Sequence, residues 1–258
     1  MKRRNLTRLI FVTGTDTGVG KTVLTALLIS HLRQTGVPAI ALKPFCSGSR
    51  ADAELLYQLQ DRELPLDQIN PWFFPEPVAP VVAARKHRKK ITLAQVVAHI
   101  QSAASSLSKV PGQQALSPAS RRSEPLSPVL LIEGAGGLLV PLGEGFTVLD
   151  LIARLRCEVL LVSANRLGTI NHTLLSHDRL RDSDLRHRVV LMDLSVPDAS
   201  SGSNPGILKE MLAPEPLFQL PFLRRPPGTT AVALTLHARR LRNKLLKVAA
   251  SFGVDVKE

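Results

Sequence analysis

The sequence has little cysteine, few aromatic residues and no long apolar run, and each scarcity excludes a class of protein. The 258 residues include two cysteines, Cys46 and Cys157, which lie far apart without metal-ligand spacing, so neither a disulfide framework nor a zinc site is expected. No stretch reaches the roughly 18 consecutive apolar residues of a membrane-spanning helix. The basic start leads into a short strand-like run and then glycines, unlike a signal peptide. We expect a cytoplasmic protein.

Acidic residues are also scarce, 21 against 33 Lys and Arg, which gives a formal net charge of +12. An excess of positive charge is typical of proteins that bind nucleic acid or anionic membranes. Here the basic residues are scattered over several segments, and a single Trp and a single Tyr offer little surface for bases to stack on. We therefore expect a solvated basic surface, with no nucleic acid and no membrane as partner.

Short apolar runs alternate with segments of helical periodicity, which indicates βα units around a parallel sheet. Strands are expected at residues 9–13, 39–42, 129–132, 159–162 and 189–191. Strands that are apolar throughout are buried on both faces, so helices are expected on both sides of the sheet. A length of 258 residues and 44% hydrophobic composition fit one α/β domain spanning residues 1–258.

Four other segments complete this organisation. Residues 22–35 have helical periodicity and end before a glycine. Residues 105–128 are rich in Ser, Pro, Gln and Gly, which predicts a mobile surface loop. Residues 71–80, PWFFPEPVAP, are too apolar for a free linker and are expected over the sheet edge or the mouth of the site. Residues 224–258 are expected to form a basic helical tail.

The strongest local signal is GTDTGVGKT at residues 14–22, directly between the first strand and the first helix. Glycines here let backbone N–H groups turn toward phosphate oxygens, and the helix N-terminus adds partial positive charge. In this geometry Lys21 reaches the terminal phosphates and the Thr22 hydroxyl coordinates Mg²⁺. Five residues separate Gly14 from Gly20, one more than usual, so this is a variant P-loop. It predicts a P-loop NTPase-type fold, but not a reaction.

Polar residues follow two other strands, at the carboxyl ends where parallel sheets bind ligands. Lys43 follows residues 39–42, and its ammonium suits negative charge developing on a transferring phosphoryl or carboxyl group. Glu133 follows residues 129–132 and is the expected partner of Mg²⁺ or its waters. Asp52, at the start of a helical segment, equally fits a helix-capping acid or a magnesium ligand.

In order and spacing, GTDTGVGKT, KPFCSG, the isolated Asp52, IEGAGGLLVPL and RLGTINHTLLS resemble the dethiobiotin synthase family over about residues 9–223. The resemblance implies an ATP- and Mg²⁺-dependent ligase of biotin biosynthesis. Such enzymes carboxylate one amine of the diamine 7,8-diaminopelargonate with CO₂, phosphorylate the carbamate to a carbamic-phosphoric anhydride, and close the ureido ring with loss of phosphate. The resemblance also implies a homodimer with the substrate site at the interface.

The resemblance further implies a role for individual residues. Lys43 would hold the carbamate and Lys21 would follow the γ-phosphate, both as catalytic residues. Thr22, Asp52 and Glu133 would be the metal ligands. The implied nucleotide-binding residues are Gly18, Val19, Gly20, Lys21, Thr22, Val23, Asp52, Glu133, Gly134, Ala135, Gly136, Asp193, Pro221, Phe222 and Leu223. The implied substrate-binding residues are Thr17, Lys43, Ser47, Gly168, Thr169, Ile170 and Asn171, the last four acting on the substrate carboxylate across the dimer interface.

Two positions depart from the family's pattern. Gly18 stands where many members carry an acid in the P-loop. Asp193 stands where the family has an Asn that reads the adenine base. A carboxylate only accepts hydrogen bonds, so Asp193 can take the adenine amino proton but cannot donate to the ring nitrogen, which puts base selectivity in doubt.

Two alternative functions remain open. Another P-loop amidoligase would share the fold and the variant loop, although no glutaminase-like Cys and His arrangement follows residue 224. A partition-type ATPase would bind DNA or membrane through its basic surface. That class has a second lysine early in the P-loop, and residues 15–17 contain none.

Overall fold

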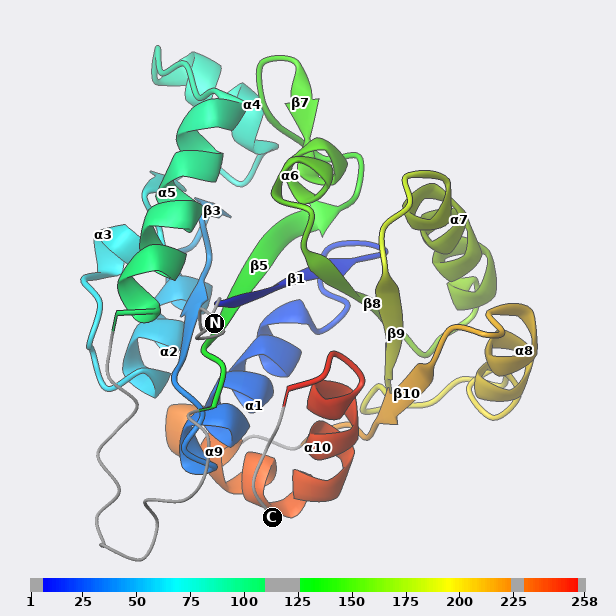
Figure 1. Ribbon diagram of the computed structural model, residues 1–258. Coiled ribbons are helices and arrows are strands. Elements are labelled where there is room, and N and C mark those ends of the chain that lie inside the picture. The colour runs from blue at the N-terminus through cyan, green and yellow to red at the C-terminus, as the bar shows by residue number, and fades with distance from the viewer. Residues whose placement is uncertain (1–6, 110–125, 224–229, 255–258) are drawn as a thin grey trace, which may run out of the picture.

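The computed structural model describes residues 7–109, 126–223 and 230–254. Its main sheet has six strands in the order β10-β9-β8-β1-β5-β2, and all neighbouring pairs are parallel (Figure 1). The strands are β1 (Arg8–Gly14), β2 (Ala39–Leu42), β5 (Val129–Gly137), β8 (Glu158–Ala164), β9 (His187–Met192) and β10 (Leu217–Leu220). The expected parallel sheet is confirmed, with β10 as a further edge strand.

The two faces of the sheet are covered by different helices. Because successive residues of a strand point to opposite faces, Ile10 and Val12 of β1 pack into one cluster and Phe11 into the other. The first cluster includes α1 (Lys21–Gln34), α2 (Ala51–Leu59), α9 (Thr230–Arg240) and α10 (Arg242–Ala250). The second includes α4 (Pro80–Lys86), α5 (Leu93–Leu107), α6 (Val148–Leu155), α7 (Thr169–Asp182) and α8 (Asn204–Met211). Helices on both faces are thus confirmed.

Short elements complete the described structure. β3 (Phe45–Ser47) pairs in parallel with β4 (Trp72–Phe74), and β6 (Pro141–Gly143) pairs antiparallel with β7 (Phe146–Thr147). A single-turn helix, α3 (Leu66–Ile69), precedes β4. No helix in the described ranges is both long and apolar enough to cross a membrane.

The basic C-terminal region is part of the domain in residues 230–254, not a detached tail. α9 packs along α1, and α10 contacts both α1 and β10 (Figure 1). Leu234, Leu245 and Val248 are fully buried. The apolar sides of the two helices therefore complete the core, while Arg242 and Lys244 remain exposed.

The expected surface loop at residues 105–128 was wrong for residues 105–107, which belong to α5. Leu107 is buried and continues the apolar face formed by Val96 and Ile100, so packing extends the helix past the first serines. Residues 110–125 of this predicted loop lie outside the described part of the chain.

A buried histidine pair lies between α7 and β9. Nδ1 of His177 is 2.7 Å from Nε2 of His187, whose Nδ1 is 2.9 Å from the Leu185 carbonyl oxygen. If His187 donates to that carbonyl, its Nε2 accepts from His177. Burial, followed by the charge of His187, lowers the pKa of His177 below its ordinary 6.5.

We expect acid to destabilise the protein through this pair. The unfolded chain takes up a proton on His177 at higher pH than the folded chain, so the stabilisation present above about pH 6.5 is lost as the pH falls. His177→Gln should therefore show a smaller drop in thermal unfolding midpoint between about pH 7 and about pH 5 than the unsubstituted protein. The exposed His172→Gln should behave like the unsubstituted protein; equal drops in all three proteins would refute this account.

Candidate active site

The loop between β1 and α1 forms a cradle at the carboxyl end of the sheet. Gly18 and Gly20 have φ values of 76° and 104°, in the left-handed region that favours glycine. A Cβ on Gly14 would lie 3.1 Å from the Lys21 ammonium, so the loop closes tightly there. No side chain in the described structure caps the start of α1, which leaves N–H groups of its first turn facing the cradle. Such a cradle binds anions.

A fully buried carboxylate, that of Glu133, lies below this cradle within β5, which continues past it to Gly137. Its Oε1 accepts a hydrogen bond of 2.6 Å from the Thr22 hydroxyl and another of 2.6 Å from the Lys43 ammonium. Lys43 also donates to the Gly134 carbonyl at 3.0 Å and lies 3.5 Å from a carboxylate oxygen of Asp52. Thr22, Asp52 and Glu133, from three different elements, are thus joined through the Lys43 ammonium and the Glu133 carboxylate.

These residues also fit a magnesium ion. The described residues contain no group of three His, Cys, Asp or Glu side chains that could hold a metal by themselves. The second oxygen of Glu133, Oε2, is buried and has no hydrogen-bond partner in the described structure. An unsatisfied buried oxygen is costly, and a hard cation held jointly with phosphate oxygens would satisfy it. The oxygens of Thr22, Asp52 and Glu133 are the ligand type that Mg²⁺ prefers.

The pKa values of the two lysines of the site shift in opposite directions. Burial, assisted by the charge of Lys43, lowers the pKa of Lys21 to about 8. Burial also acts to lower the pKa of Lys43, but its ion pairs with Glu133 and Asp52 outweigh burial and raise that pKa above its ordinary value. Lys43 therefore stays charged over the physiological pH range, and Lys21, already mostly charged near neutral pH, is held more firmly in its charged form by an anion in the cradle.

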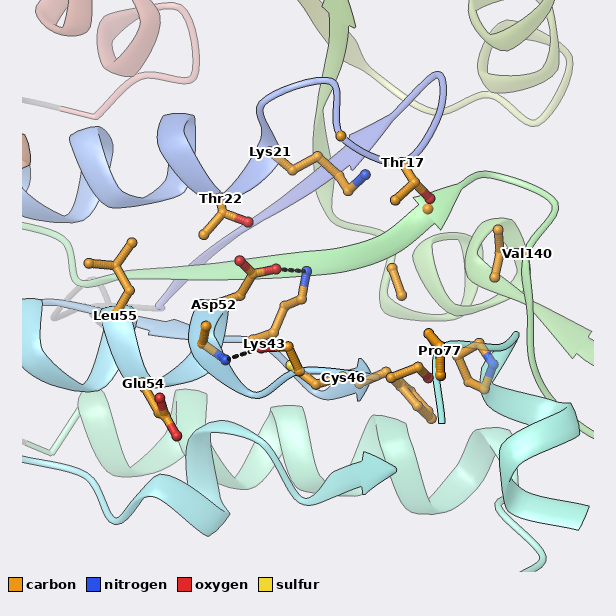
Figure 2. A pocket seen from close by; sticks show the side chains of 18 of the residues that line it. Thr17, Lys21, Thr22, Lys43, Cys46, Asp52, Glu54, Leu55, Pro77 and Val140 are labelled. Carbon is orange, nitrogen blue, oxygen red and sulfur yellow. Dashed lines mark hydrogen bonds and ion pairs between the residues drawn. The ribbon is translucent and has the colours of Figure 1, made fainter. Parts of the chain in front are cut away.

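Lys21, Thr22, Lys43 and Asp52 line a pocket of about 960 Å³. Figure 2 shows this pocket from close by. Lys21 and Thr22 enter it from the P-loop side, and Lys43 enters from the opposite side, at the end of β2 (Figure 2). The expected site residues that line the pocket are Thr17, Gly18, Gly20, Lys21, Thr22, Val23, Lys43, Ser47, Asp52, Ala135 and Gly136. Val19, Glu133 and Gly134 are buried behind this lining.

Some lining residues were not expected from the sequence. The expectation for the Pro-rich stretch holds for its last part, because residues 77–80 form one wall of the pocket, whereas other lining residues were not foreseen. Leu55 and Gln58 follow Asp52 at intervals of three on α2, so helical spacing could have placed them on the same face. Cys46 also lines the pocket, but burial raises the pKa of its thiol to about 11, which excludes a thiolate nucleophile near neutral pH.

The remaining expected residues do not line this pocket. Residues 168–171 start α7, and the role expected of them depends on a second copy of the chain. Asp193 and residues 221–223 follow β9 and β10, on the other side of β1 from the pocket.

A parallel sheet with a P-loop after one of its central strands and an acid in the neighbouring strand defines a P-loop NTPase-type protein. The MinD cell division protein of Aquifex aeolicus has the same fold. In its complex with MinC it superimposes with a TM-score of 0.52 at 15% identity, covering 92% of this chain and 96% of that chain. Alone, it gives a TM-score of 0.50 at 16% identity, covering 92% and 97%.

Similarity in sequence identifies the family within this fold. The AAA-domain family AAA_26 matches residues 8–224. The chain is 35% identical to the ATP-dependent dethiobiotin synthetase of Anaeromyxobacter sp. (strain Fw109-5), over 83% of this chain and 90% of that protein. It is 32% identical to that of Bacillus velezensis, over 79% and 82%, and 34% identical to that of Methanocaldococcus jannaschii, over 72% and 79%. The chain belongs to the dethiobiotin synthetase family.

Proposed function

We propose that this protein uses ATP to close the ureido ring of dethiobiotin from 7,8-diaminopelargonate and CO₂. The observation that carries the proposal is the convergence of Thr22 and Lys43 on the buried carboxylate of Glu133, with Asp52 beside the Lys43 ammonium, next to a P-loop. Membership of the dethiobiotin synthetase family supports the identity of the substrates. The pocket supplies charged groups at fixed positions, as phosphoryl transfer requires. The raised pKa of the Cys46 thiol in its lining argues against covalent catalysis by that residue.

The reaction would proceed in three balanced steps. One amine of the substrate adds to CO₂ and loses a proton, forming a carbamate. A carbamate oxygen attacks the γ-phosphorus and ADP leaves, forming a carbamic-phosphoric anhydride. The second amine then attacks the carbonyl carbon and loses a proton, the C–O bond to phosphate breaks, and the ring closes as phosphate departs.

The lysines have separate roles in this sequence. Lys43, a fixed cation facing the pocket, neutralises charge on the carbamate and on the transferring phosphoryl group. Lys21, whose ammonium donates to the Asp16 carbonyl oxygen at 2.8 Å within the loop, would bind the terminal phosphates. Thr22, Asp52 and Glu133 would hold Mg²⁺, which supplies charge neutralisation at the phosphates when bound. Thr17 and Ser47 line the pocket where the diamine and carbamate would lie.

The substrate carboxylate would be bound by residues 168–171 of a second copy in a homodimer. α7 has 14 residues and starts after Gly168 without a side-chain cap, so its first N–H groups suit an anion. Leu167, directly before this helix start, is 81% exposed, as expected of a residue that a partner covers.

Release of phosphate should depend on both substrates. We expect phosphate release from ATP to rise by about tenfold or more only when diamine and bicarbonate are present together, with dethiobiotin formed in equal amount, because the carbamate is the phosphoryl acceptor. Phosphate can be measured by a coupled assay and dethiobiotin by mass spectrometry. Phosphate release that does not depend on the diamine, or that increases when DNA or anionic vesicles are added, would favour the partition-type alternative.

A further inference from the structure

Three neighbouring strands end at a polar cluster that the pocket does not include. Asn165 follows β8, Asp193 follows β9, and Gln219 lies near the end of β10 (Figure 1). The main chain fixes this arrangement, because the Asn165 N–H donates to the Met192 carbonyl at 2.8 Å and the Asp193 N–H donates to the Leu220 carbonyl at 2.9 Å. The cluster is therefore built from fixed strand ends.

Its position suits the base of a nucleotide bound at the P-loop. A Cβ on Gly20, the P-loop residue directly before α1, would lie 3.1 Å from the Met192 side chain, so the end of β9 adjoins the loop. The other side of the loop is occupied by the pocket with Lys43, where the terminal phosphates would react. The base then extends toward β9 and β10, where Phe222 is 47% exposed and offers a ring to pack against.

The cluster presents its carboxylate as a hydrogen-bond acceptor. The buried Asn204 donates to Oδ1 of Asn165 at 3.0 Å, which leaves the Asn165 amide to donate to Oδ1 of Asp193 at 2.9 Å. The Gln219 amide nitrogen lies 2.9 and 3.1 Å from the two carboxylate oxygens of Asp193. Gln219 is exposed, so its amide can move aside. The Gln219 amide nitrogen therefore occupies the position that a hydrogen-bond donor of a base would take against the Asp193 carboxylate.

We infer that Asp193 selects the base of the nucleotide and favours guanine over adenine. Guanine presents two adjacent donors, N1–H and the N2 amino group, one for each carboxylate oxygen. Adenine presents one amino donor beside an unprotonated ring nitrogen, which would face a carboxylate oxygen with no proton between them. Hydrogen bonds to a carboxylate are stronger than neutral ones, which amplifies the difference. The inference rests on the proposed function and refines it: ATP remains a phosphoryl donor for the ligase, and GTP is the better one.

Calorimetric titration of the full-length protein with Mg²⁺ and either GTP or ATP, without diamine, tests the inference. We expect GTP to bind about tenfold more tightly than ATP. Asp193→Asn, whose amide can both accept from and donate to adenine, should reverse the preference. Gln219→Ala should retain it, because the carboxylate remains. Glu210→Gln, an exposed carboxylate on α8, is the matched control and should retain the unsubstituted ratio.

The outcomes separate this inference from the proposed function. Equal or tighter binding of ATP by the unsubstituted protein overturns the inference alone, and so does a guanine preference that Asp193→Asn leaves unchanged. Binding of neither nucleotide overturns the proposed function as well. If Asp193→Asn does not fold, the ratio in the unsubstituted and Gln219→Ala proteins still decides.

Discussion

Replacing Lys43 by Ala should lower kcat for ring closure by about 10²–10³-fold while changing the Kd for nucleotide by less than about threefold. The Lys43 ammonium is buried, permanently charged and directed into the pocket opposite the P-loop lysine. In this position it would stabilise charge that develops during phosphoryl transfer, whereas the P-loop itself would bind the phosphates. Steady-state kinetics and calorimetric nucleotide binding measure the two quantities separately.

The substitution also leaves the Glu133 carboxylate buried without its cation, which costs about 3–5 kcal/mol of stability. A double variant, Lys43→Ala with Glu133→Gln, removes the unpaired charge and should recover part of that stability without recovering activity. Lys86→Ala, an exposed lysine on α4, is the control for charge alone. If kcat and nucleotide affinity fall in proportion in the Lys43→Ala protein, Lys43 is a binding residue and its assigned role is wrong.

Glu133→Gln should raise the Mg²⁺ concentration needed for half-maximal activity by about 10–100-fold. The carboxylate has one oxygen occupied by Thr22 and Lys43 and one oxygen buried without a partner, which is the expected magnesium contact. An amide is a weaker ligand, and its nitrogen cannot accept from Lys43. Nucleotide affinity measured at several Mg²⁺ concentrations provides a readout independent of turnover.

Glu210→Gln is the matched control for this experiment, since it removes an exposed carboxylate far from the P-loop in sequence. Its Mg²⁺ dependence should equal that of the unsubstituted protein. A Glu133→Gln protein with unchanged Mg²⁺ dependence would show that the buried carboxylate only positions Lys43.

The fold was predictable where apolar runs were continuous. Residues 129–132 are buried on both faces in β5, so every position is apolar. β10 was not predicted as a strand because it lies at the sheet edge, where Gln219 is exposed and the apolar run is interrupted. The packing of α9 and α10 on α1 was also missed, because basic residues on the exposed sides of these helices dominate the composition of the segment.

The site was predictable where its residues lie in one short motif. The P-loop joins a strand and a helix, so its geometry follows from local sequence. The contacts of Glu133 with Thr22 and Lys43 bridge 111 and 90 positions and depend on how the sheet assembles. Asn165 was not singled out at all, since an asparagine after a strand has no distinctive pattern until Asp193 and Gln219 lie beside it.

The central claim, that a carbamate oxygen receives the phosphoryl group, is tested most directly with ¹⁸O-labelled bicarbonate in a single turnover. Since the attacking oxygen leaves with phosphate when the ring closes, we predict one labelled oxygen in each phosphate released, in equal amount to dethiobiotin. Phosphate that carries oxygen from solvent water and none from bicarbonate would contradict the account, because it would mean that the P-loop only hydrolyses its nucleotide.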